Sequence, residues 1–310
     1  MTRVVLATAY GGPEVLTVVD QPVGDPGPGQ ARVEVRAAGV NPADWKSYTG
    51  AFGTDPAALP KRLGFEVSGV VTAVGPDAPV AVGDEVIGFR VSGGYAAELV
   101  VPGSALVPKP ASLGWEQAAG LMLTGATAVH ALTATGVGQG DTVLVHGAAG
   151  GVGLMAVQLA ALRGARVIGT VGGDGAELVR RFGAETVRYG DGLADRVRDL
   201  APDGVDAAVD LVGTDEAVDV SLELVADRQR IATIAAFGRA GSEGIKALGG
   251  GPGADPGTEL RDAARLDLAQ AAGAGRLEVV VAGTFPLEEV AAAHRQGMAG
   301  HTHGKLVLLP

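Results

Sequence analysis

A run of small residues, Gly147-Ala148-Ala149-Gly150-Gly151-Val152-Gly153, follows the apolar segment Thr142–His146 and precedes an amphipathic one. Glycines at these positions let the chain turn tightly and let backbone N–H groups approach a pyrophosphate. A helix starting near Val152 would direct its positive dipole end toward that anion. The spacing is typical of a dinucleotide-binding turn in which Ala replaces the first Gly. The alternative is a tight turn without a ligand.

The next apolar segment, Ala165–Thr170, ends without an acidic residue. An acid about 20 residues beyond the turn would bind the ribose 2′-hydroxyl of NAD. The small residues that follow leave room for a 2′-phosphate, which favours NADP(H). Asp174, a little further along, is a possible acceptor for the ribose hydroxyl and would favour NAD(H). No Lys or Arg lies between Arg166 and Arg180. The residue that would bind the phosphate is therefore left open.

Composition excludes several other chemistries. The 310 residues include no cysteine, so there is no disulfide framework, thiolate zinc site or cysteine nucleophile. The net charge is −11, from 24 Lys+Arg and 35 Asp+Glu, which argues against nucleic acid and anionic membranes as partners. The N-terminal segment is too weakly apolar for a signal peptide, so we expect a cytoplasmic protein without a membrane span.

The sequence changes rhythm near Pro110. Before it, Val-rich segments separated by Pro/Gly turns predict a barrel-like β domain, with strands at Arg3–Ala9, Ala31–Ala38, Gly69–Val74, Glu85–Phe89 and Ala96–Val101. After it, strands alternate with helices as in a doubly wound parallel sheet. The expected strands there are Thr142–His146, Ala165–Thr170, Asp206–Val212 and Arg230–Ala236, with helices at Ala176–Phe182 and Asp215–Val225.

The last quarter of the chain is expected to contain a loop, two helices and a return to β structure. Gly-rich residues Phe237–Thr258 predict an irregular loop, with a lid close to the substrate as the alternative. Glu259–Ala272 predicts a helix. Leu277–Val281 and Lys305–Leu309 are expected to be strands on either side of a helix at Leu287–Met298. Such a β-type tail suggests that the last residues rejoin the first domain.

Seven motifs together resemble the medium-chain dehydrogenase/reductase superfamily, and within it the zinc-independent, quinone oxidoreductase-like branch. The resemblance runs along nearly the whole chain. The motifs are Gly11-Gly12-Pro13-Glu14-Val15-Leu16, Gly39-Val40-Asn41-Pro42-Ala43-Asp44-Trp45-Lys46, Gly64-Phe65-Glu66-Val67-Ser68-Gly69-Val70-Val71, Val82-Gly83-Asp84-Glu85-Val86, Gly94-Tyr95-Ala96-Ala97-Glu98, the Gly147–Gly153 turn and His303-Gly304-Lys305-Leu306-Val307.

The resemblance implies an α/β protein of two domains. A GroES-like β-barrel catalytic domain would span residues 1–115 and be completed by 283–310, and a Rossmann doubly wound parallel sheet would span 116–282. The active site would lie in the cleft between them. The resemblance also implies a homodimer, without indicating a surface for it.

The resemblance implies NADPH as the cofactor and assigns residues to it. Asn41 should lie near the nicotinamide and Thr127 near the cofactor, and Gly150, Gly151 and Val152 should meet the pyrophosphate. Further along, the resemblance places Thr170 at the adenosine ribose, Tyr189 near its 2′-phosphate, and Val212 and Gly213 in a strand-end turn beside the cofactor. Gly172, just beyond the second strand, is also expected to bind the cofactor.

The chain departs from the family's patterns in three places. Asn41 and Phe65 stand where the zinc-dependent branch has Cys and His, so no zinc is expected. A Lys common in NADPH-using relatives, shortly after the second Rossmann strand, is missing. A Tyr found in some alkene reductases two residues after Asp44 is Lys46 here, with Tyr48 nearby.

Hydride addition to an alkene conjugated with a carbonyl gives an enolate, which needs oxyanion stabilisation and then a proton. Lys46 and Tyr48 are candidate donors, with Asp44 as their orienting partner. Their alternative roles are plain: Asp44 could cap a helix beginning at Trp45, Lys46 could be solvated, and Tyr48 could pack in the core. The expected substrates are enones, enoyl thioesters or quinones.

Two other functions remain open from the sequence. One is a reductive cyclase or tailoring enzyme of secondary metabolism, in which the enolate closes a ring. The other is a non-catalytic, NADPH-binding protein like the crystallins.

Overall fold

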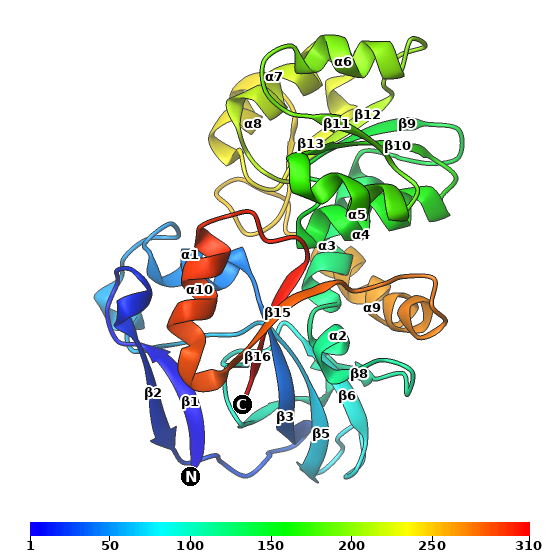
Figure 1. Ribbon diagram of the computed structural model, residues 1–310. Helices are drawn as coiled ribbons and strands as arrows, with labels where there is room; N and C mark the ends of the chain where they lie inside the picture. The colour runs from blue at the N-terminus through cyan, green and yellow to red at the C-terminus, as the bar shows by residue number, and fades with distance from the viewer. The chain divides into compact units, whose positions relative to one another are not determined.

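The computed structural model describes residues 1–310 and divides into two compact units (Figure 1). Unit 1 comprises Met1–Leu123 with Arg265–Pro310, and unit 2 is Thr124–Ala264. The boundaries between the units thus lie after residues 123 and 264, whereas the domain boundaries expected from the sequence lie after residues 115 and 282. At the second, the Ser112 hydroxyl donates to the Gly273 carbonyl over 2.7 Å, which attaches the end of α9 (Thr258–Gly273) to unit 1.

Unit 1 is built on a seven-stranded sheet in the order β15-β16-β3-β5-β6-β8, with β7 also paired to β3. The strands are β3 (Gln30–Val40), β5 (Glu66–Val74), β6 (Glu85–Phe89), β7 (Glu98–Pro102), β8 (Leu106–Pro108), β15 (Val281–Pro286) and β16 (Lys305–Leu309). The C-terminal strand β16 runs antiparallel to β3, with Leu308 opposite Ala38. The last residues therefore join the first part of the chain, as the β-type tail predicted.

Smaller elements complete unit 1. A three-stranded sheet in the order β2-β1-β4 is formed by β1 (Thr2–Ala7), β2 (Leu16–Gln21) and β4 (Lys61–Arg62). The helices are α1 (Pro42–Tyr48), α2 (Trp115–Ala119), the second half of α9, and α10 (Val290–Met298). Of these, α2 packs on β3 and β5, and α10 packs on β15 and β16.

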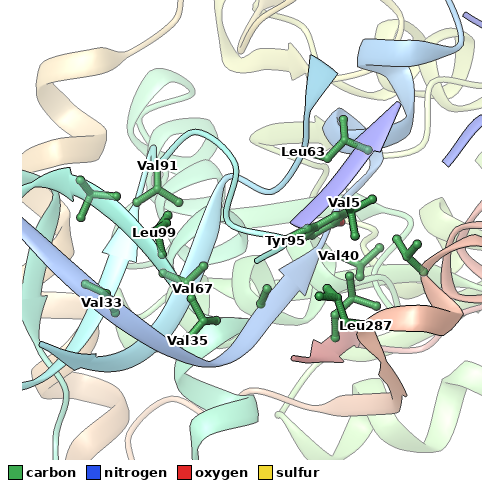
Figure 2. Packing of buried hydrophobic residues seen from close by; sticks show 14 of the residues in the cluster. Val5, Val33, Val35, Val40, Leu63, Val67, Val91, Tyr95, Leu99 and Leu287 are labelled. Carbon is green, nitrogen blue, oxygen red and sulfur yellow. The ribbon is translucent and has the colours of Figure 1, made fainter. Parts of the chain in front are cut away.

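The core of unit 1 follows the two-residue period of its strands. In β3, Ala31, Val33 and Val35 are buried, and the residues between them are more exposed. Figure 2 shows Val33 and Val35 close to Val67 of β5 and to Leu99 of β7. Beyond Arg36 the alternation ends and Ala37–Val40 are all buried, because helix α2 covers the other face of the strand there.

Unit 2 contains a six-stranded parallel sheet in the order β11-β10-β9-β12-β13-β14. The strands are β9 (Thr142–His146), β10 (Arg166–Val171), β11 (Glu185–Arg188), β12 (Ala207–Asp210), β13 (Ile231–Thr233) and β14 (Lys246–Ala247). The helices are α3 (Met122–Ala134), whose first two residues belong to unit 1, α4 (Gly151–Leu162), α5 (Ala176–Arg181), α6 (Leu193–Leu200), α7 (Asp215–Leu224) and α8 (Phe237–Glu243). Figure 1 shows α4 and α5 on one side of the sheet and α6 and α7 on the other, the doubly wound arrangement that was expected.

Two expectations about local structure were wrong. Residues Phe237–Thr258 are not simply a loop, since they form α8 and the edge strand β14, which continues the parallel ladder beyond β13. The late strand begins at Val281 rather than Leu277, and pairs with β16 from there to Pro286. Leu277 and Val279 are buried, which accounts for the apolar pattern there, but they do not belong to a strand. None of the helices is both long and apolar enough to cross a membrane.

Candidate functional site

The predicted dinucleotide turn joins β9 to α4 in unit 2. Gly147 has a left-handed backbone, with φ of 73°. A Cβ on Gly153 would lie 2.2 Å from the Gly147 carbonyl oxygen, so only glycine allows the helix to pack this closely on the turn. Gly150 is the N-cap of α4 and has no side chain to cap it. The N–H groups of the helix's first turn, from Gly151 onward, therefore lack a capping side chain and suit a pyrophosphate.

At the end of β10, Thr170 is buried and its hydroxyl accepts a hydrogen bond from the Gly147 N–H over 3.2 Å. It thus holds the glycine turn in place. Beyond it, Gly172 faces the hydroxyl of Tyr189, since a Cβ on Gly172 would be 3.3 Å from that oxygen. Tyr189 is half exposed. Contacts of Thr170, Gly172 and Tyr189 with the cofactor remain predictions.

At the end of β12, Asp210 organises the turn that contains Val212 and Gly213. One carboxylate oxygen accepts the N–H groups of Val212 (3.0 Å) and Gly213 (2.8 Å). The other accepts the hydroxyl of Thr233 on β13 over 2.7 Å. Gly213 has φ of 84°, and Val212 is half exposed at this strand end. Asp210 was not among the predicted site residues, although an acid that ends an apolar strand three residues before a glycine is a usable signal.

Two further polar side chains of unit 2 are buried. Thr127 on α3 is 5% exposed, and its hydroxyl forms no hydrogen bond within the protein, so it is free to meet a ligand. His146 at the end of β9 contacts the Ser221 hydroxyl over 3.1 Å, and that hydroxyl donates to the Ala217 carbonyl. Burial lowers the pKa of His146 to about 4, against the opposing effect of Asp210, so the imidazole beneath the turn is neutral at pH 7.

In unit 1 the residues around Asn41 form the start of α1. The helix begins at Pro42, not at the expected Trp45, and Asn41 is its N-cap. Asp44 is the third residue of the helix and its carboxylate accepts the backbone N–H groups of Asn41 (2.8 Å) and Gly64 (3.0 Å). It is fully buried, and burial raises its pKa to about 7 although these hydrogen bonds and that of Tyr95 lower it. Asp44 thus stabilises the helix start in a capping box.

The side chain of Asn41 is enclosed in a second set of contacts. Its amide nitrogen donates to the Gly39 carbonyl (3.2 Å) and to Glu66 (3.0 Å), and its oxygen accepts from the Lys305 ammonium. Lys305 also donates to the Val40 carbonyl over 3.0 Å and pairs with Glu66 over 2.8 Å. Glu66 and Lys305 are both buried. Proximity of Asn41 to a nicotinamide remains a prediction.

The two remaining predicted residues lie in different environments. Tyr48 is fully buried, with its hydroxyl 2.7 Å from Nδ1 of His294, whose Nε2 is 3.2 Å from the Tyr95 hydroxyl. Burial lowers the pKa of His294 to about 4 and raises that of Tyr48 above its usual value. Lys46 is half-buried, and its ammonium forms no hydrogen bond or ion pair with the protein. The structure thus brings Tyr48 and Asp44 into one buried network that does not include Lys46.

No group of three or more His, Cys, Asp or Glu side chains gathers closely enough to hold a metal ion. At the position where the zinc-dependent branch would have its Cys and His ligands, the structure has Asn41 and Phe65. The acid beside them, Glu66, is already paired with the ammonium of Lys305.

Two family models match the chain. Residues 27–111 match the alcohol dehydrogenase GroES-like domain, and residues 151–249 match a domain described as zinc-binding dehydrogenase. A quinone oxidoreductase of Pseudomonas aeruginosa is 36% identical, with both chains covered completely. The chain belongs to the quinone oxidoreductase-like branch of the medium-chain dehydrogenase/reductase family.

Two further relatives of this oxidoreductase family bear on its chemistry. A 2-haloacrylate reductase from a Burkholderia species is 36% identical, over 97% of this chain and 96% of that protein. A mycobacterial protein solved as a complex with NADPH superposes with a TM-score of 0.88 at 34% identity, covering both chains completely. The family assignment confirms the α/β fold with a GroES-like and a Rossmann domain.

Proposed function

We propose that the protein is an NADPH-dependent reductase that adds hydride, without zinc, to the activated C=C of an α,β-unsaturated carbonyl compound or to a quinone. The observation that carries this proposal is the uncapped N-terminus of α4 behind the glycine turn, together with the end of β10 at Thr170-Val171, which is followed by Gly172 and carries no acid. A 2-haloacrylate is itself a carbonyl-conjugated alkene, and one relative is named 2-haloacrylate reductase.

The residues of unit 2 fit the cofactor. A Cβ on Gly153 would clash with the carbonyl of Gly147, so only glycine keeps the turn in this shape. The first-turn N–H groups of α4 have no capping side chain and are free to bind the pyrophosphate. The Val212–Gly213 turn, which Asp210 holds, and the unbonded hydroxyl of Thr127 would serve the remainder of the molecule. NADPH, when bound, supplies the hydride.

Of the three predicted helpers, Lys46 is the best candidate to donate a hydrogen bond to the developing oxyanion. Its ammonium has no competing partner in the protein, whereas the polar atoms of Asp44 and the hydroxyl of Tyr48 are already bonded inside unit 1. We infer that Asp44 and Tyr48 act as positioning residues of the segment that carries Lys46. A homodimer remains a prediction.

The test is NADPH oxidation with a panel of acceptors: a cyclic enone, an enoyl thioester, a benzoquinone and an unactivated ketone. We expect turnover with activated acceptors, none with the ketone, and the same rate after prolonged treatment with a strong chelator. A rate lost to the chelator and restored by zinc would contradict the zinc-free mechanism. Tight NADPH binding without turnover of any acceptor would favour the non-catalytic alternative.

A further inference from the structure

A cation suited to a phosphate lies beside the end of β10, on the neighbouring strand. The loop that follows β10 has no Lys or Arg before Arg180, so it cannot by itself neutralise a 2′-phosphate. In the parallel ladder of β10 and β11, however, Val171 is paired with Arg188. Arg188 therefore stands directly beside the last residue of β10, next to Gly172.

Arg188 differs from the arginines around it in having an unengaged guanidinium. Arg166 pairs with Glu185, and Arg180 donates from Nε to the hydroxyl of Thr186. The Arg188 side chain is exposed and forms neither a hydrogen bond nor an ion pair with the protein. An exposed arginine without a protein partner keeps all its donors for a bidentate contact with phosphate.

The backbone that carries Arg188 is held in place from α6. The guanidinium of Arg196 donates to the carbonyl groups of Arg188 (2.8 Å), Gly190 (2.8 Å) and Asp191 (2.6 Å). The Tyr189 N–H donates to the Val171 carbonyl over 3.4 Å, which continues the pairing of the strands by one residue. A fixed backbone lowers the entropy cost of binding through the side chains that it presents.

Tyr189 adds a second donor at the same place. Its hydroxyl faces Gly172, where any side chain would come within 3.3 Å of it. Arg188 and Tyr189 are consecutive and both exposed, one beside Val171 and the other over Gly172. Both residues therefore lie at the end of β10, where the adenosine ribose of a dinucleotide binds in such sheets, and the long Arg188 side chain has no protein partner to hold it away from that ribose.

We propose that Arg188, assisted by the Tyr189 hydroxyl, binds the 2′-phosphate of NADPH and determines the preference for NADPH over NADH. Arg188 supplies from β11 the positive charge that the loop after β10 lacks. Asp174 in that loop carries no ion pair and opposes the phosphate, so the charge of Arg188 decides the balance. This inference rests on the proposed NADPH-dependent function.

The test compares Arg188→Gln with Arg276→Gln, a control that removes the same charge from an exposed arginine of unit 1. Binding of 2′,5′-ADP and of 5′-AMP is measured by calorimetry at fixed ionic strength, so that the two probes differ only in the 2′-phosphate. We expect Arg188→Gln to weaken 2′,5′-ADP binding by about tenfold or more and to leave 5′-AMP within about twofold. Arg276→Gln should change neither.

Two results would overturn the inference, and they have different meanings. If the wild-type protein prefers 2′,5′-ADP but Arg188→Gln binds it equally well, the NADPH preference stands and Arg188 is not its source. If the wild-type protein binds 5′-AMP as tightly as 2′,5′-ADP, the proposed NADPH dependence itself is wrong, and the role of Arg188 falls with it. The same variants, titrated with NADPH and NADH by fluorescence, should show the same ratio.

Discussion

The ammonium of Lys305 explains how a group of oxygens near Asn41 can be buried together. Glu66 contributes a charge that would be costly in the interior, and Asn41 and Val40 contribute further acceptors. One buried cation contacts all three. Because Lys305 lies on the last strand, β16, this arrangement depends on the C-terminal tail joining unit 1.

Replacement of Lys305 should therefore be much more costly than loss of a surface ion pair. Lys305→Met leaves Glu66 buried and uncompensated, so we expect a loss of about 3–5 kcal/mol in the free energy of unfolding, measured with urea. Lys305→Met combined with Glu66→Gln should recover part of it. Arg3→Gln, which breaks the exposed pair with Glu288, should cost less than about 1 kcal/mol. Equal losses for the two single variants would contradict the argument.

Lys46 and Tyr48 should respond differently to substitution if only Lys46 meets the substrate. We expect Lys46→Ala to lower kcat on a cyclic enone by about a hundredfold, with unchanged thermal stability. Tyr48→Phe should leave kcat nearly unchanged and cost about 1 kcal/mol of stability, since it removes one buried hydrogen bond to His294. If kcat is unchanged in Lys46→Ala, Lys46 is only a solvated side chain and does not contact the oxyanion.

The glycine turn and α4 depend on close backbone packing, which glycine substitutions can measure. Gly153→Ala would place a Cβ 2.2 Å from the Gly147 carbonyl oxygen, so the helix must shift. We expect a loss of about 1–3 kcal/mol in stability together with weaker NADPH binding, measured by urea unfolding and fluorescence titration.

Gly241 on α8 provides the matched control. It is exposed in mid-helix, and a Cβ there would meet no atom within 4 Å. Gly241→Ala should therefore stabilise the protein by about 0.5–1 kcal/mol, because alanine loses less entropy in a helix. If both alanine variants were equally stable, the turn would not require glycine for packing.

The strands that could be predicted were those with a strong local pattern. β6, β9 and β16 have the expected bounds, and the apolar helix after the glycine turn starts within one residue of its expected position. The two-residue strand β14 could not be predicted, because its pairing with β13 depends on contacts that are distant in sequence. The short strand β11, which carries Arg188, was also missed, although it lies beside β10.

The site shows the same division between local and distant information. The turn glycines followed from spacing and were placed correctly at the start of α4. Asn41 and Asp44 form hydrogen bonds in the interior with Glu66, Lys305 and Tyr95. These partners are distant in sequence, so no local pattern reveals them. The sequence indicates the type of each candidate residue, but it does not predict whether that residue is buried.

Across the whole protein, two buried groups of one network should make stability depend on pH in opposite senses. His294 is neutral in the folded protein down to a pKa of about 4, below its usual 6.5, so its contribution is complete above pH 6.5 and is lost as pH falls toward 4. Asp44 has the reverse shift, from 3.8 to about 7. Its protonated form is favoured by folding, so its contribution is complete below about pH 4 and is lost as pH rises to 7.

The Asp44→Asn variant separates these effects, because asparagine cannot titrate. We expect the difference in unfolding free energy, wild type minus Asp44→Asn, to fall between pH 4.5 and 6.5 by about 1.4 kcal/mol per pH unit. Loss of a backbone hydrogen bond in the variant adds a constant offset but no slope. Asp20→Asn, at an exposed position on β2, should give a curve parallel to that of the wild type. A parallel curve for Asp44→Asn as well would show that the carboxyl is ionised in the fold throughout this range, with its three donors outweighing burial.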